Sequence, residues 1–339
     1  MKDKQTGKVT INEVAAYAGV SKSTVSRYIN GKLDAISPQK VKSIKKAIAE
    51  LNYRPSQMAQ GLKVKKSKLI GFLVADITNP FSVATLRGVE EVCDQYGYSI
   101  MVCNTDNSPE KEREMLHKLN AHYIEGLIIN TTGRNNDVLL DLIDQDVSIV
   151  LVDRKVPGLK IDAVTTNNRE ITGQIVNMMY DKGYAHVGLF TEPMKGISPR
   201  EERVSAYTEI ALARDAGRTP FVHEVEAKDK KALMESVKSF LAVSEGEKKA
   251  ILGNNGLLML KIISCLYELG VSIPEDVGIA GFDDTEWYKL IGPGITTIAQ
   301  PSHEMGKVAM ERIIKRLEGD ESAPQTIQLE AELVLRHSL

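Results

Sequence analysis

Cysteine is scarce in this sequence of 339 residues. Its three cysteines, Cys93, Cys103 and Cys265, are odd in number and show no C-x-x-C spacing. This pattern excludes a disulfide framework and gives no sign of a zinc site. We interpret the three residues as buried or inert thiols, and we expect neither a metal nor a cofactor.

Long apolar runs are also missing. No uninterrupted apolar stretch reaches the roughly 18 residues that a membrane span needs. The chain begins with MKDKQTGKVT, whose lysines are not followed by the apolar segment of a signal peptide. We therefore expect a cytoplasmic protein with no contact to a membrane.

The common sequence signatures of enzymes are absent too. We find no P-loop, no G-x-G-x-x-G after a predicted strand, no H-E-x-x-H and no G-x-S-x-G. The six histidines are scattered, and His117 and His122 are five residues apart, so they do not share a helix face. A protein without enzymatic activity is the favoured interpretation.

Charge is present but unevenly distributed. Residues 1–68 hold 15 of the 43 Lys and Arg residues and only 4 of the 45 Asp and Glu residues, so the rest of the chain is acidic. A basic block on an acidic body is typical of a protein in which one small domain contacts the phosphates of a nucleic acid. The alternative is a solvated lysine-rich tail.

The basic block also carries the pattern of a folded domain. Thr10 and Glu13 form a capping box before a helix over 11–18, and Gly19 ends that helix. Ser21 is expected to cap a second helix over 22–29, and Ser37 a third helix that starts at Pro38. The third helix has a buried stripe of Val41, Ile44, Ile48 and Leu51. Helix, tight turn and helix make a DNA-binding motif.

The second helix presents polar side chains for the major groove, where bases are read by hydrogen bonds. We expect Lys22, Ser23 and Arg27 to contact base edges. The expected phosphate contacts are hydroxyl and amide groups around this helix, namely Thr10, Tyr17, Ser21, Thr24, Ser26, Tyr28 and Asn30. For each of these residues the alternative is an ordinary exposed helix side chain.

The stretch TINEVAAYAGVSKSTVSRYING, followed by ISPQKV, AIAELNYRP and MAQGLK, resembles the headpiece of the LacI/GalR family of bacterial repressors. The resemblance implies a hinge helix over 56–63 and a leucine, here Leu62, that wedges into the minor groove and kinks the duplex. Gly61 lowers helix propensity there, in keeping with a hinge that folds on DNA. Leu62 as a simple linker residue is the alternative.

From residue 69 onward, short apolar strands alternate with amphipathic helices, which predicts parallel sheets. Strands are expected at 69–74, 99–103, 126–129, 148–152, 186–190, 250–252 and 277–281. Together with the resemblance, this predicts an all-α helix-turn-helix headpiece (1–55), a hinge and linker (56–68), and an α/β body (69–339). The body would have two doubly wound parallel sheets in two lobes, as in periplasmic binding proteins. One lobe would take 69–166 and 295–325, the other 167–294 and 326–339.

Ligands of such sheets bind beyond the carboxyl ends of the strands. Asp76 and Phe81 follow the first predicted strand, and Asp153 and Arg154 follow the fourth. Ser198, Arg200 and Arg203 lie at the start of a predicted helix, whose amides favour an anion. The resemblance further implies effector contacts by Arg203, Asn255, Asp283 and Gln300. Loop caps or surface ion pairs are the alternative roles.

Two stretches depart from the family pattern and make the expected pocket more basic and less aromatic. Residues 226–230 read EAKDK where many members have an aromatic residue, and Asn255 is followed by Gly256 instead of Asp. We therefore predict a small anionic effector, a sugar acid or a sugar phosphate rather than a neutral sugar, held by Arg200, Arg203 and either Lys228 or Lys230.

These features predict a repressor of carbohydrate metabolism or uptake genes that binds double-stranded, pseudo-palindromic operator DNA. A homodimer is expected because one headpiece makes too few contacts, with a partner-facing surface over 81–95. A tetramer is disfavoured because no heptad tail follows Leu333. Inducer and corepressor remain equally open as the effector's role. A solute-binding protein is the other alternative, but it is disfavoured by the headpiece and by the missing signal peptide.

Overall fold

The computed structural model describes residues 9–29, 31–53, 67–215, 217, 219–244 and 246–339. The chain divides into two compact units, Met1–Ser67 and Lys68–Leu339, which are described here one at a time. Two of the predicted DNA contacts, Asn30 and Leu62, lie outside the described residues, as do the predicted hinge 56–63 and Gly61.

The first unit is a bundle of short helices: α1 (Ile11–Ala18), α2 (Lys22–Ile29), the 3₁₀ turn η1 (Leu33–Ala35) and α3 (Pro38–Glu50). The capping box at the start of α1 is present, and Gly19 ends the helix with a φ of 64°, a conformation that suits glycine. Val14, Ala15, Val25, Ile44 and Ala47 form the buried core. The helix-turn-helix prediction is confirmed at this level.

Two details of the expected caps and stripe come out differently. Ser21 does cap α2, since its Oγ accepts a hydrogen bond of 3.2 Å from the Thr24 amide. Ser37 is the N-cap residue of α3 and Pro38 follows it at the start of the helix, as predicted, but in the described part of the unit the Ser37 side chain makes no cap hydrogen bond. Ile44 and the small Ala47 are the fully buried residues of α3, whereas Val41, Ile48 and Leu51 are only partly buried.

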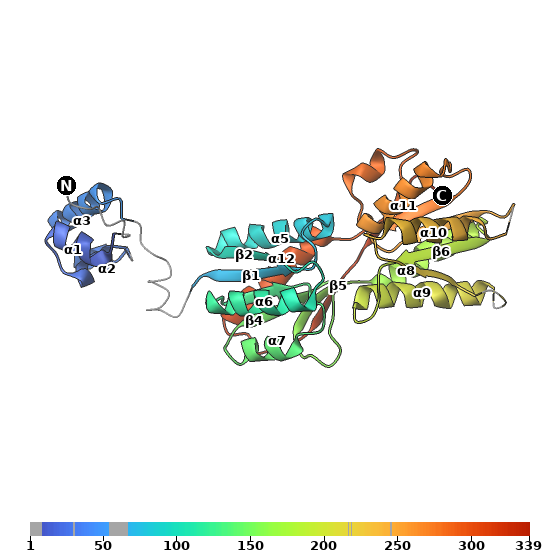
Figure 1. Cartoon of the computed structure of the whole chain (residues 1–339). Helices are drawn as coiled ribbons and strands as arrows, with labels where there is room; N and C mark the ends of the chain where they lie inside the picture. The colour runs from blue at the N-terminus through green and yellow to red at the C-terminus, as the bar shows by residue number, and fades with distance from the viewer. Residues whose placement is uncertain (1–8, 30, 54–66, 216, 218, 245) are drawn as a thin grey trace. The chain divides into compact units, whose positions relative to one another are not determined.

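The second unit contains two six-stranded sheets (Figure 1). The first sheet has the order β11-β5-β4-β3-β1-β2, with all pairs parallel. Its strands are β1 (Leu69–Val74), β2 (Ser99–Asn104), β3 (Gly126–Ile129), β4 (Ser148–Val152), β5 (Asp162–Thr166) and β11 (Thr326–Leu329). We call this sheet and its helices the first lobe.

The second sheet has the order β12-β10-β9-β8-β6-β7 and is parallel except for the β10–β12 pair. Its strands are β6 (His186–Thr191), β7 (Phe221–Glu224), β8 (Lys249–Gly253), β9 (Gly278–Phe282), β10 (Thr296–Ala299) and β12 (Glu332–Val334). With its helices it forms the second lobe. The prediction of two doubly wound sheets is confirmed.

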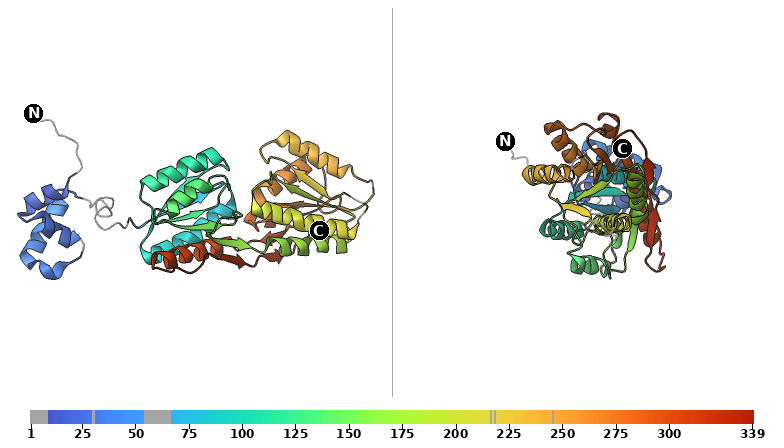
Figure 2. Two further views of the ribbon diagram at one scale, coloured as in Figure 1. Left: turned by 90° about the horizontal axis from the view of Figure 1, so that it is seen from below. Right: turned by 90° about the vertical axis from the view of Figure 1, so that its right-hand side faces the viewer.

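Helices cover both faces of each sheet, and each face has its own buried apolar core (Figure 2). The first lobe has α5 (Pro80–Tyr96), α6 (Pro109–Ala121), α7 (Asn136–Ile143) and α12 (Ser302–Leu317). The second has α8 (Asn168–Asp181), α9 (Ser198–Arg214), α10 (Lys230–Leu241), α11 (Gly256–Glu268) and the 3₁₀ turn η2 (Glu286–Lys289).

The chain crosses between the lobes at points that differ from the predicted 295 and 325. Strand β10 (Thr296–Ala299) pairs with β9 in the second lobe, and β11 (Thr326–Leu329) pairs with β5 in the first. The return to the first lobe therefore comes at Gln300, between β10 and α12, and the last crossing comes at Glu330, between β11 and β12. Strand pairing, which a linear pattern does not reveal, sets these boundaries.

Candidate DNA-binding and effector-binding sites

Helix α2 presents its polar face away from the core of the first unit. Val25 is fully buried on one side, whereas Lys22, Ser23 and Arg27 are exposed on the other. Thr24, Ser26 and Tyr28 are partly buried at the flanks of that face. Exposed donors on one face of the second helix are what major-groove recognition requires.

The other predicted phosphate contacts are hydroxyls that already have partners within the unit. Thr10 Oγ1 donates to Glu13 Oε2 at 2.8 Å, and the Tyr17 hydroxyl donates to Glu50. This contact with Glu50 raises the pKa of Tyr17. Ser21 Oγ lies 2.8 Å from both Ser23 Oγ and Thr24 Oγ1. A hydroxyl donates once and accepts twice, and Ser21 Oγ, which also accepts from the Thr24 amide, already has three partners. A phosphate contact by Thr10, Tyr17 or Ser21 therefore requires the hydroxyl to exchange one of its present partners for the phosphate.

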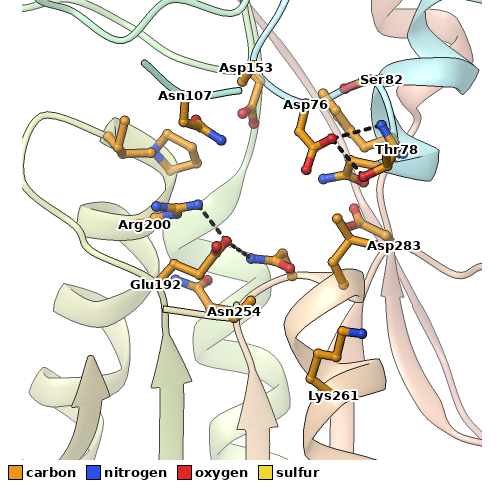
Figure 3. Close-up of a pocket in the computed structure, with 18 of the residues that line it drawn as sticks. Asp76, Thr78, Ser82, Asn107, Asp153, Glu192, Arg200, Asn254, Lys261 and Asp283 are labelled. Atoms are coloured by element: carbon orange, nitrogen blue, oxygen red, sulfur yellow. Dashed lines mark hydrogen bonds and ion pairs between the residues drawn. The ribbon is translucent and has the colours of Figure 1, made fainter. Parts of the chain in front are cut away.

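A cavity of about 640 Å³ lies at the carboxyl ends of the strands of both lobes (Figure 3). Nine of the ten predicted effector residues line it: Asp76, Phe81, Asp153, Arg154, Arg200, Arg203, Asn255, Asp283 and Gln300. Its volume falls within the range of small-molecule sites. Residues far apart in sequence therefore meet in one cavity.

Ser198, the tenth predicted residue, is not part of the cavity lining. Its Oγ accepts a hydrogen bond of 2.8 Å from the backbone amide of Lys155, which belongs to the first lobe. The Lys155 ammonium also forms an ion pair of 2.6 Å with Glu202 on α9. Ser198 thus takes part in a contact between the lobes.

Arg203 is the centre of a hydrogen-bonded network. Its Nε donates to Asn168 at 2.8 Å, its Nη1 to the Asn254 carbonyl at 2.7 Å and its Nη2 to Gln300 at 3.0 Å. The guanidinium lies 3.7 Å above the ring of Phe282. Burial lowers the pKa of Arg203, against the attraction of Asp153 and Asp283. All three nitrogens therefore have protein partners.

Asp283 and Asn255 connect this network to the start of α11. Asp283 accepts from the Gly256 amide at 3.1 Å and from Gln300 Nε2 at 2.5 Å. Asn255 is the N-cap of α11, where it accepts from the Leu258 amide at 2.9 Å. Its amide group also donates to Glu192 at 2.8 Å. The predicted alternative of a loop cap thus holds for Asn255, although the residue also lines the cavity.

Asp76 and Phe81 enter the cavity from the first lobe. Asp76 Oδ1 accepts from the Thr78 amide at 2.8 Å and from the Thr78 hydroxyl at 2.7 Å. Its second carboxylate oxygen is a further acceptor for a ligand hydroxyl. Phe81 lines the cavity and also belongs to the buried core of the first lobe.

Arg154 and Arg200 approach the same part of the cavity from different lobes. Arg154 donates through Nη1 to the Thr131 carbonyl at 3.1 Å and through Nη2 to Asn107 at 2.8 Å. Arg200 donates to the Pro193 carbonyl at 2.7 Å and pairs with Glu192 at 2.7 Å. Burial, and then the positive charge of Arg200, lower the pKa of Arg154 to about 10.

Asp153 lies next to these cations with a backbone φ of 66°. Its carboxylate accepts a hydrogen bond of 3.1 Å from Asn130. Burial raises the pKa of Asp153, and the attraction of Arg203 and Arg154 opposes this rise without cancelling it. The deep part of the cavity thus mixes buried charges of both signs.

The sequence interpretation missed several residues of the lining, including Asn107, Asn130, Glu192, Asn254 and Lys261. The first four lie within three residues of the ends of β2, β3, β6 and β8. The rule that ligand contacts follow strand ends would have found them if it had been applied to every strand. Lys261 lies in the second turn of α11 and gave no such signal.

The lining carries more positive than negative side chains. Arg154, Arg200, Arg203, Lys228, Lys230 and Lys261 face Asp76, Asp153, Glu192 and Asp283. Among the described residues, no group of three or more His, Cys, Asp or Glu could hold a metal ion. No helix in the described part of the chain is long and apolar enough to cross a membrane.

A helix-turn-helix unit followed by a two-lobed body with a polar cavity defines a DNA-binding transcription regulator with a ligand-binding domain, and not an enzyme. Comparison with known proteins agrees with this class. Residues 10–56 match the model of bacterial regulatory proteins of the lacI family, and residues 176–339 match the periplasmic binding protein-like domain. The chain belongs to the LacI family of transcription regulators.

Three similar proteins illustrate the match. The HTH-type transcriptional regulator KdgR of Bacillus subtilis (strain 168) is 67% identical over the full length of both chains. The lac repressor dimer bound to operator and the anti-inducer ONPF shares the fold with a TM-score of 0.81 and 24% identity, over 98% of this chain and 99% of that one. The CelR–cellobiose complex matches with a TM-score of 0.70 and 23% identity, over 98% and 100% of the two chains.

Proposed function

We propose that this regulator binds a pseudo-palindromic operator as a homodimer and represses genes of carbohydrate metabolism or uptake. A small anionic sugar, either a sugar acid or a sugar phosphate, controls its affinity for DNA. Two structural neighbours support this proposal, one a repressor dimer on its operator and the other a regulator with a bound sugar. The charged cavity is the observation that carries the anionic class.

The DNA-binding part of the proposal assigns base contacts to Lys22, Ser23 and Arg27, whose exposure on one face of α2 supports it. Thr10, Tyr17, Ser21, Thr24, Ser26 and Asn30 contact phosphates and set the register. Leu62 kinks the minor groove from the hinge. In this arrangement residues 1–55 are the headpiece, 56–68 the hinge and linker, and 69–339 the effector-binding body.

Dimer formation follows from the size of the headpiece. A single unit with one recognition helix makes fewer contacts than specific binding needs, and two-fold symmetry suits two half-sites. Helix α5 carries the exposed Val83, in keeping with the partner-facing surface expected over residues 81–95.

The effector part of the proposal rests on the cations that the cavity brings together. Arg154 and Arg203 are almost fully buried, and Arg200 lies close enough to Arg154 to lower its pKa. Holding several guanidinium groups near one another in a cavity is costly unless an anion compensates their charge. A sugar acid or sugar phosphate supplies both that anion and hydroxyls for the carboxylates nearby.

A gel-shift experiment on the DNA upstream of the protein's own gene tests the proposal. The protein is titrated against this DNA at low salt, alone and with a panel of sugar acids, sugar phosphates and the corresponding neutral sugars. We expect a retained complex whose stability changes with at least one anionic sugar, in either direction. Failure to retain any DNA under any condition contradicts the DNA-binding assignment, and a response to neutral sugars only contradicts the anionic class.

A further inference from the structure

We propose that the anionic group of the effector binds between Arg154 and Arg200, and not at Arg203, while its hydroxyl-bearing end lies toward Asp76 and Asp283. This inference rests on the proposed function, since it concerns the same cavity. It differs from the sequence interpretation, which placed Arg203 among the anion-holding residues and left Arg154 without that role.

The state of Arg154 is the first argument. Its side chain is buried, with 6% of the residue exposed, and its two Nη atoms donate to neutral oxygens of Thr131 and Asn107. Within the described part of the chain, its Nε has no hydrogen-bond partner and the guanidinium forms no ion pair within 4.0 Å. A buried charge with an unused donor is costly, so an anion from outside the protein would stabilise it.

The position of Arg200 is the second argument. It comes from α9 of the second lobe and lines the same cavity as Arg154, which comes from the loop after β4 of the first lobe. Only one carboxylate in the described structure, that of Glu192, pairs with Arg200, and Asn255 shares that carboxylate. An oxyanion between the two guanidinium groups would therefore attract both lobes toward each other and favour closure of the body.

Arg203 is a poorer choice for the anion than Arg154, because each of its three nitrogens already has a hydrogen-bond partner in the protein. Its three nitrogens donate to Asn168, Asn254 and Gln300, and Phe282 covers one face of the guanidinium. Both Asp153 and Asp283 are close enough to act on its pKa. We therefore interpret Arg203 as the residue that holds the base of the cavity together.

The positions of the carboxylates in the cavity indicate the orientation of the bound effector. In Figure 3, Asp76, Thr78 and Asp283 lie on the opposite side of the cavity from Arg200 and Asn107. Carboxylates repel an anionic group and accept hydrogen bonds from hydroxyls. A polyhydroxylated chain with a single anionic end fits this separation of charge, with the anion on the side of Arg200 and the hydroxyls on the side of Asp76.

The test compares variants of two cations of the cavity lining in the full-length protein, Arg154→Met and Arg154→Lys, and Arg200→Met. Arg113→Met is the matched control, because Arg113 belongs to the same lobe as Arg154, lies outside the lining and pairs with Asp137 at 2.7 Å. Isothermal calorimetry measures the binding of D-gluconate, D-galacturonate, glucose 6-phosphate and neutral D-glucose. A cooperative thermal unfolding transition close to that of the wild type shows that the body of each variant is folded. We expect at least one anionic probe to bind the wild type, and its affinity to fall at least tenfold in Arg154→Met and Arg200→Met. In Arg113→Met we expect less than a threefold change.

Arg154→Lys separates geometry from charge, because it keeps the positive charge and loses the Nε donor. We expect an intermediate loss of affinity for this variant. If an anionic probe binds the wild type and both Arg154 variants equally well, or if Arg113→Met loses as much affinity as Arg154→Met, the assignment of the anion to Arg154 is wrong and the proposed function stands. If no anionic probe binds the wild type, the anionic effector class and this inference are both wrong.

Discussion

Among single residues, Glu112 shows how the protein holds the cavity in shape without lining it. This carboxylate of α6 is completely buried and accepts hydrogen bonds from the loop after β3. The Thr132 amide donates at 2.6 Å, the Thr132 hydroxyl at 2.8 Å, and Asn135 Nδ2 at 2.9 Å. The Thr131 carbonyl of the same loop accepts a hydrogen bond from Arg154. By holding this loop in place, Glu112 also positions Arg154, one of the cations that line the cavity.

Replacing Glu112 by Ala should therefore lower the free energy of unfolding by about 3 kcal/mol, since several buried donors lose their acceptor. Urea unfolding followed by circular dichroism measures this change. Glu114→Ala on the same helix is the control, because Glu114 is exposed and pairs with Lys118 at the surface. We expect a change of at most about 0.5 kcal/mol there. Equal effects of the two substitutions would contradict the assigned role of Glu112.

The residue scale also shows where prediction from sequence succeeds. Strand ends are recognisable from apolar runs, so Asp76, Asp153 and Arg154 could be assigned to one cavity before the structure was known. Hydrogen-bond partners could not be assigned in this way. That each nitrogen of Arg203 has a partner and that Ser198 contacts Lys155 depend on groups more than 30 residues away in the chain. Only the tertiary structure brings them together.

Among the elements, helices α5 and α12 approach each other closely in the first lobe. A Cβ atom added to Gly88 would lie 1.9 Å from the carbonyl oxygen of His303, and one added to Gly306 would lie 2.0 Å from that of Thr85. Both obstacles are backbone atoms, which cannot move without shifting a helix. The two glycines therefore set the distance between the helices.

Gly88→Ala should destabilise the protein by about 2 kcal/mol or more, because the overpacking outweighs the gain of about 1 kcal/mol in helix propensity. Gly173→Ala on α8 is the matched control, since the added Cβ would meet only the flexible end of Ile210 at 3.3 Å. We expect that control to be neutral or slightly stabilising. Thermal unfolding of both variants measures the difference, and a stable Gly88→Ala protein would rule out the tight contact.

A second pair of elements, the loop after β4 and helix α9, connects the two lobes through Lys155 and Glu202. The other Glu202 carboxylate oxygen accepts from Asn168 at 3.0 Å, and Asn168 accepts from Arg203 at 2.8 Å. The ion pair between the lobes is thus joined by hydrogen bonds to the base of the cavity. It should favour the arrangement of the lobes that binds the effector.

Lys155→Glu places two carboxylates opposite each other across the lobes. We expect it to weaken binding of an anionic effector identified in the gel-shift panel by about fivefold. The exchange Lys155→Glu with Glu202→Lys restores the attraction and should recover most of the affinity. Lys111→Glu, which breaks an exposed ion pair with Asp106 inside the first lobe, is the control in the same calorimetric experiment. If the exchange variant binds the effector as weakly as Lys155→Glu does, the ion pair between Lys155 and Glu202 does not favour effector binding.

The elements also mark the limit of prediction from the pattern of residues. All seven predicted strands are present, most of them within one residue of the expected bounds. Strands β5, β7, β10, β11 and β12 were not predicted, because each of them contains a charged residue or two polar residues and so lacks an apolar run. Their pairing across the sheet, and not their sequence, fixes the last two lobe crossings.

On the scale of the whole molecule, the distribution of charge matches the division of labour that we propose. The basic excess is confined to the first 68 residues, and the acidic body repels DNA phosphates. Inside the body, Arg and Lys side chains line the cavity and form ion-pair clusters that join segments distant in sequence. One such cluster joins α12 to β5 and to the turn before β11.

Asp162 is the centre of this cluster and is almost fully buried. Arg312 Nε lies 2.9 Å and Arg316 Nε 2.7 Å from its Oδ2, and the Gln325 amide donates to its Oδ1 at 2.9 Å. Burial raises the pKa of Asp162, but the hydrogen bonds from Arg316, Gln325 and Arg312 outweigh burial and leave it lowered. The Ser322 amide and Arg312 hold the pKa of Asp320 well below its usual range.

These lowered pKa values make the body sensitive to acid. A carboxylate whose pKa is lower in the folded than in the unfolded chain binds fewer protons when folded, so its contribution to stability is complete above the unfolded value of about 4 and is lost as the pH falls below it. We expect the urea midpoint to be nearly constant from pH 7 to 5 and to fall steeply below pH 4. Asp162→Asn should have a lower free energy of unfolding than the wild type at pH 7. The difference between the two should narrow at pH 3, because the unfolded wild-type chain then takes up a proton at Asp162 more readily than the folded protein does. If the difference in free energy of unfolding between the two proteins stays constant from pH 7 to pH 3, the charge of Asp162 does not contribute to stability.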